Sequence, residues 1–288
     1  MRWTPGGRSS NLEDRRSGGG GGMGKGLGLG GTVVVLALSL LFGRNLFTDL
    51  GVEPGVGAGG APMTAADSIA QDTAVQFMSF LLDDVQGVWA EKLPKYGTTY
   101  RPARLAIFRN STSSGCGPAQ SAMGPFYCPL DERVYLDLGF YDELSSRYGA
   151  PGQVERGTVS PTSDFAQAYV LAHELGHHVQ HVLGTDARVR QAQESNPGQA
   201  NELSVRLELQ ADCYAGVWAN STSQRNMLDP GDIDEALGAA AAVGDDRIQQ
   251  RTSGRVNVDS FTHGSAAQRS EWFKRGFESG DPRSCTTI

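Results

Sequence analysis

The sequence has no basic stripe with interleaved aromatic residues, and its body is short of positive charge. Residues 1–25 hold five basic and two acidic side chains, a net charge of +3, and Arg44 adds one positive charge. Because the whole 288-residue chain has a formal charge of −7, the remainder has −11. Phosphate binding requires clustered Lys and Arg. The composition therefore argues against nucleic acid as a main partner.

Long apolar runs are also scarce, with one exception near the N-terminus. Residues 26–43 contain no charged side chain, and residues 32–42 (TVVVLALSLLF) are almost entirely apolar. Such a stretch is just long enough for one helix to cross a hydrocarbon core of about 30 Å. A cleaved signal peptide is the alternative, although no A-x-A site follows. We favour a retained membrane anchor, with the preceding basic residues keeping the N-terminus cytoplasmic and the body outside.

Glycine is common only in the first 60 residues, which contain 18 of the 38 glycines. We expect residues 1–25 to be a disordered, glycine-rich cytoplasmic segment. Residues 26–47 are predicted to form the transmembrane helix, and residues 48–65 a flexible linker. Residues 66–288 then form one extracytoplasmic domain. Since 39% of the chain is apolar, this domain can build a sizeable core, which excludes a fully disordered chain.

Cysteine is scarce as well, with four residues and no C-x-x-C spacing, so a cysteine-based zinc site is not expected. An even number in an exported domain suggests two disulfides, for which three pairings are possible. Cys116 and Cys128 lie on one short glycine-containing loop and are the natural local pair, which leaves Cys213 with Cys285. Four reduced, buried thiols are the alternative.

The apolar periodicity of the body predicts an α+β domain with a helical majority. Strands are expected at residues 104–108 and 134–138. Helices are expected at residues 66–90, 140–148, 162–183, 202–220, 233–243 and 266–277. This order of elements indicates a small antiparallel sheet accompanied mainly by helices.

Histidine is rare, but four of the five histidines lie in one nine-residue window, namely His173, His177, His178 and His181. His173 to His177 form an H-E-x-x-H motif inside a predicted helix. Residues four apart lie on one helix face, so both imidazoles can bind one metal ion. Glu174 can project toward a water molecule on that ion. The two other histidines of the window are more typical of packing, capping or solvent exposure.

Two histidines do not complete a catalytic zinc site, which needs a third protein ligand and an open position for water. No further histidine follows at the spacing of the three-histidine version. Glu208 and Asp212 are four apart on the next long helix and share a face. Glu208 would bind the metal, and Asp212 would accept the free ring N–H of a ligating histidine. The alternatives are a solvated acid pair and Glu202, which better fits a helix start.

Four segments together resemble the putative neutral zinc metallopeptidase family: HELGHHVQ, ELQADCYAG, GPFYCPLDERVYLDL and SFTHGSAAQRSEWFKRG. The resemblance covers nearly the whole chain, and its metal site is similar to that of gluzincins such as thermolysin. It implies a glycine-rich cytoplasmic N-terminus, one membrane span and an external, zincin-like catalytic domain. It also implies one zinc ion (Zn2+) per chain bound by His173, His177 and Glu208, with Glu174 as the base.

His263 is the remaining histidine and lies in a Phe-Thr-His-Gly-Ser segment before the last predicted helix. A lone histidine is more often a cap or a surface residue than a catalyst. Gluzincins, however, commonly use a downstream His or Tyr to stabilise the oxyanion of the tetrahedral intermediate. His263 is therefore a candidate for this role, and Tyr169 is the next residue to consider.

The sequence as a whole predicts a membrane-anchored zinc endopeptidase, or a narrower peptidase, acting on peptides or proteins. Glu174 would take a proton from the zinc-bound water and pass it to the leaving nitrogen. Residues 134–138 could be a sheet edge that pairs with an extended peptide, or simply a core strand. A zinc-stabilised binding or scaffold protein without turnover is the alternative, which has no need of Glu174. A hydrolase of non-peptide substrates could use the same site.

Overall fold

The computed structural model describes residues 1–16, 65–140 and 164–287, and the side chains of residues 65–71 are outside this description. The predicted transmembrane helix, the linker and most of the predicted helix at 140–148 lie outside the described residues. Among the residues that are described, no helix is long and apolar enough to cross a membrane.

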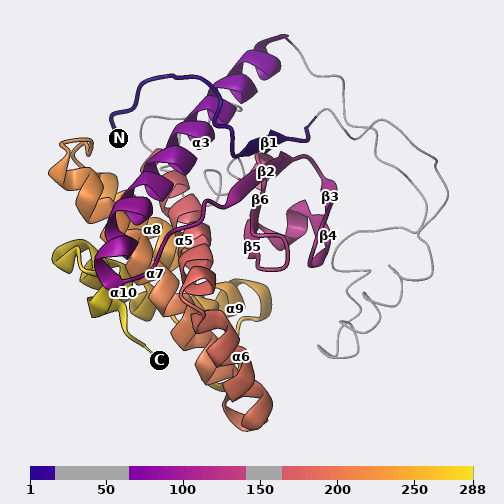
Figure 1. Ribbon diagram of the computed structural model, residues 1–288. Helices are drawn as coiled ribbons and strands as arrows, with labels where there is room; N and C mark the ends of the chain where they lie inside the picture. The colour runs from indigo at the N-terminus through magenta and orange to yellow at the C-terminus, as the bar shows by residue number, and fades with distance from the viewer. Residues whose placement is uncertain (17–64, 141–163, 288) are drawn as a thin grey trace, which may run out of the picture. The chain divides into compact units, whose positions relative to one another are not determined.

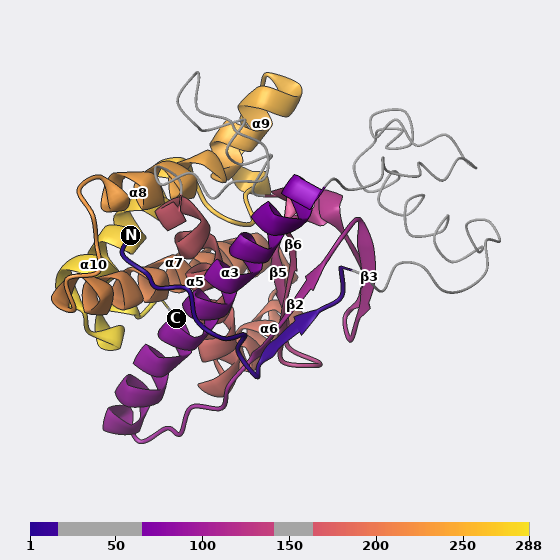
Figure 2. The ribbon, with the colours of Figure 1, turned by 90° about the horizontal axis from the view of Figure 1, so that it is seen from above.

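The described part of the chain is a mainly helical α+β structure, as predicted (Figure 1). Helix α5 lies between the sheet and helix α7, and α10 packs against the other side of α7 (Figures 1 and 2). The α-helices are α3 (Ala65–Lys92), α5 (Asp164–Val182), α6 (Thr185–Ser195), α7 (Ala200–Gln224), α8 (Asp232–Ala242), α9 (Asp245–Ser253) and α10 (Ala266–Ser279). Short 3-10 helices are η1 (Leu93–Tyr96), η2 (Ser121–Met123), η3 (Pro197–Gln199), η4 (Val258–Ser260) and η5 (Pro282–Cys285).

Five of the predicted helices are confirmed to within a few residues at their ends, whereas α6 and α9 were not predicted. Both missed helices are short and mainly polar, and they bury few side chains. In α6 only Thr185 and Val189 are buried, and in α9 only Asp245. Helices of this length depend on tertiary contacts more than on their own propensity. Their local sequence therefore contains little of the apolar periodicity on which the prediction relied.

The main sheet has four strands in the order β1 (Leu12–Asp14), β2 (Arg104–Phe108), β6 (Arg133–Asp137) and β5 (Phe126–Cys128). β2 is parallel to both β1 and β6, and only β5 is antiparallel to its neighbour. The prediction of an antiparallel sheet is therefore wrong for most of its pairs. Between β2 and β6 the chain forms the hairpin of β3 (Ser111–Ser114) and β4 (Gly117–Gln120) and then β5. This connection is long enough to return the chain to the starting end of the sheet, which a parallel pair requires.

The strand predicted as a possible sheet edge, residues 134–138, is an interior strand instead. β6 lies between β2 and β5, and Val134, Tyr135 and Leu136 are all buried. The reading of this segment as core is correct. Within the described residues, β5 is the outer strand on this side of the sheet.

Residues 1–16 pack against the domain, so the prediction of disorder is wrong for this part of residues 1–25. The amino group of Met1 lies 2.8 Å from Asp164 and 3.4 Å from Asp232. Ser9 donates to Asp83 on α3, and Leu12 on β1 pairs with Leu105 on β2. Figure 2 shows this segment running along α3 before it enters the sheet. Trp3 also packs against Phe77 and Phe80 on α3, so this segment is held by apolar packing as well as by backbone pairing and ion pairs.

Close helix contacts around α7 position the chemically important residues. A side chain at Gly216 on α7 would collide with the Phe273 carbonyl group on α10, and one at Gly276 with the Cys213 carbonyl group. On the opposite side, a Cβ at Gly176 on α5 would lie 3.0 Å from the Ala211 carbonyl oxygen. Glycine thus allows α5 and α10 to approach the same part of α7 closely.

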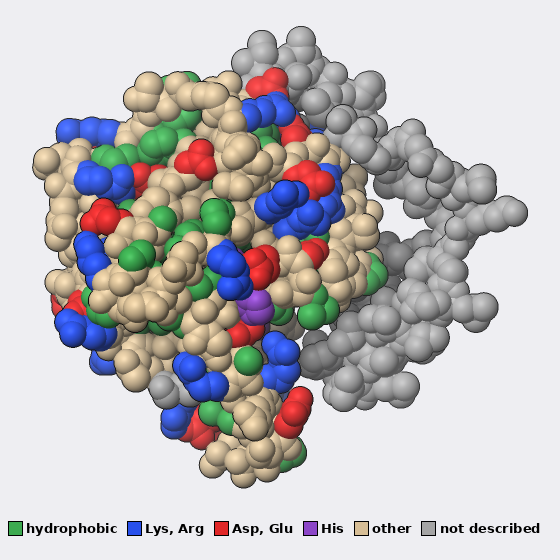
Figure 3. Space-filling model, in the orientation of Figure 1, with side chains coloured by type: hydrophobic (Ala, Val, Ile, Leu, Met, Phe, Trp, Pro, Cys, Tyr) green, Lys and Arg blue, Asp and Glu red, His purple; other side chains and the backbone are tan. Residues whose placement is uncertain are grey.

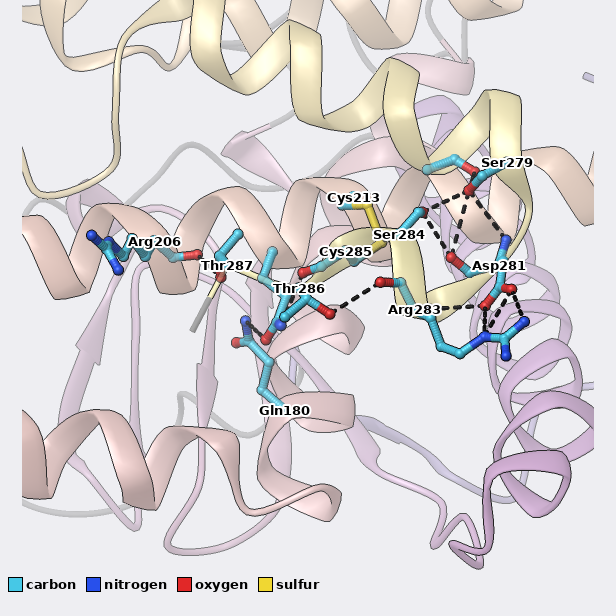
Figure 4. The surroundings of a disulfide bond; sticks show 12 residues. Gln180, Arg206, Cys213, Ser279, Asp281, Arg283, Ser284, Cys285, Thr286 and Thr287 are labelled. Atoms are coloured by element: carbon cyan, nitrogen blue, oxygen red, sulfur yellow. Dashed lines mark hydrogen bonds and ion pairs between the residues drawn. A yellow bond between two sulfur atoms is a disulfide. The ribbon is translucent and has the colours of Figure 1, made fainter.

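Both predicted disulfides are confirmed. Cys116 and Cys128 are joined by an S–S bond of 2.04 Å, and Cys213 and Cys285 by one of 2.02 Å. The second disulfide attaches the C-terminal segment to α7 (Figure 4). It therefore connects two segments that are 72 residues apart in sequence.

Candidate metal centre

Three predicted ligands converge from two helices. His173 and His177 lie one turn apart on α5, and Glu208 on α7 faces them. Glu208 oxygens lie 3.2 Å from His173 Nε2 and 3.4 Å from His177 Nε2. Zinc bonds of about 2.1 Å in tetrahedral geometry place ligand atoms roughly 3.4 Å apart. The spacing and the nitrogen–nitrogen–oxygen donor set therefore fit one zinc ion.

The electrostatics of these residues favour a bound cation. Burial raises the pKa of Glu208, but the two facing imidazoles outweigh this effect and hold its pKa well below the usual value. Burial likewise lowers the pKa of His173, but the Asp212 carboxylate outweighs this effect and raises the pKa to about 10. The two carboxylates thus stabilise positive charge on the residues beside them, an environment that also favours a bound cation.

Glu174 lies in the same cavity, which has a volume of about 600 Å³ and is also lined by His173, His177 and Glu208. Its side chain is buried. Burial raises the pKa of Glu174, although the neighbouring histidines act in the opposite direction. A raised pKa brings a carboxylate closer to the range in which it can both take up and release a proton.

Asp212 contacts His173 as predicted, and it has further partners that the sequence analysis missed. Its Oδ1 atom lies 2.8 Å from His173 Nδ1 and accepts a hydrogen bond of 2.5 Å from the Tyr169 hydroxyl group. Arg269 on α10 donates to both carboxylate oxygens, at 2.8 and 2.9 Å. Because His173 Nδ1 faces a carboxylate, that nitrogen carries the proton and Nε2 is left for the metal.

Arg269 could have been found from its position in the last helix. The buried residues of α10 are Ala266, Arg269, Phe273 and Gly276. They recur at intervals of three and four residues, which places the arginine on the apolar face. An arginine on such a face requires a buried acid as a partner. Asp212 is that partner, and its pKa is lowered because Arg269 outweighs the effect of burial.

The Asp212→Asn substitution is expected to have two effects. Arg269 would lose its charged partner while buried, which costs about 3–5 kcal/mol of unfolding free energy. His173 would lose its orientation, which lowers zinc affinity by about 10–100-fold. Urea unfolding of the zinc-free protein measures the first effect, and competition with a chelator measures the second.

Glu202→Gln is the matched control for this substitution, because Glu202 lies on the same helix but is exposed. Its carboxylate pairs with Arg206 at 2.6 Å and is not in the cavity. This position agrees with the reading of Glu202 as a helix-start residue. We expect the control to change neither quantity, and equal effects of the two substitutions would contradict the role of Asp212.

The two other histidines of the motif window have separate partners. His178 is buried, with Nδ1 2.9 Å from the Tyr127 hydroxyl group and Nε2 2.6 Å from the Arg101 carbonyl oxygen. It thereby connects α5 with β5 and with the segment before β2. His181 Nδ1 lies 2.8 Å from the Asp186 carboxylate. Both sets of contacts are structural, so His173 and His177 remain the candidate metal ligands of this window.

His263 lies at the wall of the same cavity, on the loop before α10. Asp245 accepts hydrogen bonds from the backbone N–H groups of Thr262, His263 and Gly264, and its Oδ1 atom lies 3.2 Å from His263 Nδ1. This hydrogen bond raises the pKa of His263. Ser265 forms the N-cap of α10 with a complete capping box, so His263 does not cap the helix.

The cavity extends beyond the metal ligands toward β5 and α6. Phe126 and Tyr127 of β5 line one part of it, and Val189 and Gln193 of α6 line another. In Figure 3, histidine is visible on the surface between acidic and basic side chains. The candidate metal ligands therefore line a space that can accommodate a ligand larger than water.

Comparisons with known proteins give a matching family and several relatives of this chain. A family model described as "Putative neutral zinc metallopeptidase" matches residues 1–288. The "Uncharacterized protein YpfJ" of Escherichia coli (strain K12) is 46% identical, covering 100% of this chain and 99% of the relative. The "Uncharacterized protein Rv2575" of Mycobacterium tuberculosis is 41% identical, covering 83% of this chain and 84% of the relative. No solved structure matches.

Proposed function

Since the chain belongs to the putative neutral zinc metallopeptidase family, we propose that it is a zinc-dependent endopeptidase. One observation supports this proposal above all others. His173, His177 and Glu208 present three metal-binding atoms within 4.8 Å of one another, and Glu174 lines the same cavity. This combination of ligands and a base is the one required for hydrolysis by a metal-activated water.

Each residue then has a defined task. A bound zinc ion supplies a Lewis acid and lowers the pKa of its water. His173, His177 and Glu208 would hold the ion, and Asp212 orients His173. The carboxylate of Glu174 takes the proton of the attacking water and delivers it to the leaving nitrogen. The imidazole of His263 donates to the oxygen on which negative charge develops.

The outer strand β5 is the best-placed element to hold an extended peptide. Its Phe126 and Tyr127 line the cavity, and β5 is the last strand in the sheet order on that side. The backbone N–H and C=O groups of an outer strand can pair with an added strand. We therefore propose β5 as the peptide-binding edge, in place of residues 134–138.

The binding or scaffold function requires ligands but no base. Glu174 is buried beside the candidate ligands, and burying a carboxylate costs free energy that a protein which only binds zinc has no reason to retain. Its position therefore favours an enzyme. A hydrolase of non-peptide substrates remains the second candidate, because the same water and base can attack an ester.

The test uses the purified chain with zinc, an unfolded protein substrate and an ester substrate. We expect about one zinc ion per chain, new peptide N-termini by mass spectrometry, loss of cleavage with a chelator, and recovery with zinc. Glu208→Ala should lose the zinc, while Glu202→Ala should retain it. Ester cleavage alone would favour the second candidate, and stoichiometric zinc without any hydrolysis would favour a binding protein.

We also propose that the domain functions outside the cytoplasm, since its two disulfides are typical of oxidising compartments. Residues 1–16 contact the domain. Within one molecule, residues 1–16 and the domain must therefore lie on the same side of the membrane. A single crossing at residues 26–47 would separate them. We therefore place residues 1–16 outside the cytoplasm as well, rather than inside it as their basic residues suggested.

Thiol labelling in intact cells tests this placement. Ser10 and Ser253 are exposed, and all four native cysteines form disulfides. We expect a membrane-impermeant thiol reagent to label Ser10→Cys and Ser253→Cys equally. Labelling of Ser253→Cys alone would support the single crossing with a cytoplasmic N-terminus. Permeabilised cells provide the control for total reactivity.

A further inference from the structure

A chain of buried amide groups connects the ligand His177 with the C-terminal disulfide. His177 Nδ1 lies 2.8 Å from Gln180 Oε1. Gln180 Nε2 donates to the Leu207 carbonyl oxygen at 2.6 Å and to Gln210 Oε1 at 3.1 Å. Gln210 Nε2 in turn donates to the Cys285 carbonyl oxygen at 3.0 Å. Figure 4 shows Gln180 directed toward the segment that contains Cys285.

The direction of every hydrogen bond in this chain is fixed by main-chain carbonyl groups, which can only accept. The Leu207 carbonyl oxygen requires the NH2 group of Gln180, and the Cys285 carbonyl oxygen requires the NH2 group of Gln210. The oxygen of Gln180 must therefore face His177. Since an amide oxygen also only accepts, His177 Nδ1 must carry the proton.

The proton on Nδ1 leaves the other ring nitrogen of His177 free for the metal. His177 Nε2 faces Glu208 at 3.4 Å, on the side of the ring where the ion would lie. Both amides are buried, Gln180 completely and Gln210 almost completely. Water does not compete for these hydrogen bonds in such a position, so the tautomer is set by the protein.

We infer that Gln180 is a positioning residue that sets the tautomer and ring orientation of His177, in the way that Asp212 does for His173. The inference rests on the proposed metal centre. The Cys213–Cys285 disulfide contributes to this arrangement. It attaches Cys285 to α7, and the carbonyl group of Cys285 orients Gln210. The C-terminal segment thereby contributes to metal binding without contacting the metal.

Gln180→Met tests the inference, because methionine has a similar size but no hydrogen-bond acceptor of comparable strength. We expect zinc affinity, measured by competition with a chelator, to fall by about 10–100-fold. In NMR spectra of the zinc-loaded protein, the slowly exchanging Nδ1 proton of His177 should lose its protection from solvent. The corresponding proton of His173 should keep it, because Asp212 is unchanged.

Gln86→Met is the matched control, since Gln86 is a buried amide of α3 that accepts from the Tyr100 hydroxyl group. It should cost stability but leave zinc affinity unchanged. Gln210→Met is the second variant, and it should give a smaller loss of affinity because Leu207 still orients Gln180. Equal zinc affinities of the Gln180 and Gln86 variants would overturn the inference. A wild-type chain that binds no zinc would instead overturn the proposed metal centre itself.

Discussion

Glu174→Gln is expected to lower the rate of peptide hydrolysis by about 10²–10⁴-fold while one zinc ion stays bound. The amide has nearly the shape of the carboxylate, but it cannot take up the proton of the attacking water. Glu174 lines the cavity beside His173 and His177, and its pKa is raised by burial. It is not among the residues whose donor atoms converge as metal ligands. The substitution should therefore abolish the chemical step while the zinc ion remains bound.

Zinc content separates this substitution from the loss of a ligand. Glu208→Gln, on the facing helix, should lower both hydrolysis and zinc content, because Glu208 oxygens lie 3.2 and 3.4 Å from the two imidazoles. The measurements are the initial rate of cleavage and the metal content of dialysed protein. Hydrolysis by Glu174→Gln within tenfold of wild type would mean that another group is the base.

The convergence of the candidate metal ligands could be predicted because most of the required geometry is local. The spacing of His173 and His177 on one helix fixes their relative position, and the same holds for Glu208 and Asp212 on the next long helix. The distance between the two helices could not be predicted from the sequence. That distance depends on Gly176, which allows α5 to approach Ala211 on α7.

The supporting contacts could not be predicted because they join segments that are distant in sequence. Arg269 reaches Asp212 only because glycines allow α7 and α10 to pack closely. Gln180 stands in the quoted motif segment, but its role depends on Gln210 and on the carbonyl group of Cys285. No local pattern indicates which buried polar groups will contact one another. An arginine on an apolar helix face indicates only that a buried acidic partner exists.

The sheet was predicted less well than the helices for a related reason. Periodicity identifies β2 and β6 as strands, but it does not specify their neighbours or direction. β5 has only three residues, and β1 belongs to a segment with few apolar side chains. Residues 1–16 are held by pairing with β2 and by the ion pairs of Met1, which form only in the folded domain.

His263→Ala is expected to lower kcat by about 10²–10³-fold with little change in KM or zinc content. Its imidazole lies at the cavity wall, and Asp245 fixes the loop through three backbone hydrogen bonds. The hydrogen bond with Asp245 raises the pKa of His263, so the protonated donor persists above a pH of about 6.5. The contribution of His263 should decrease as the pH rises through this raised pKa, and the variant should lose that part of the pH profile.

Ser265→Ala distinguishes a catalytic loop from a merely structural one. Ser265 is two residues from His263 and caps α10, so its loss should cost about 1 kcal/mol of unfolding free energy with near-normal turnover. His263→Ala should show the opposite pattern, with a large loss of kcat and a nearly unchanged Tm. If kcat of His263→Ala stays within threefold of wild type, His263 has no part in the reaction. Tyr169 would then be a poor candidate for the oxyanion donor, because it is buried and its hydroxyl group already donates to Asp212.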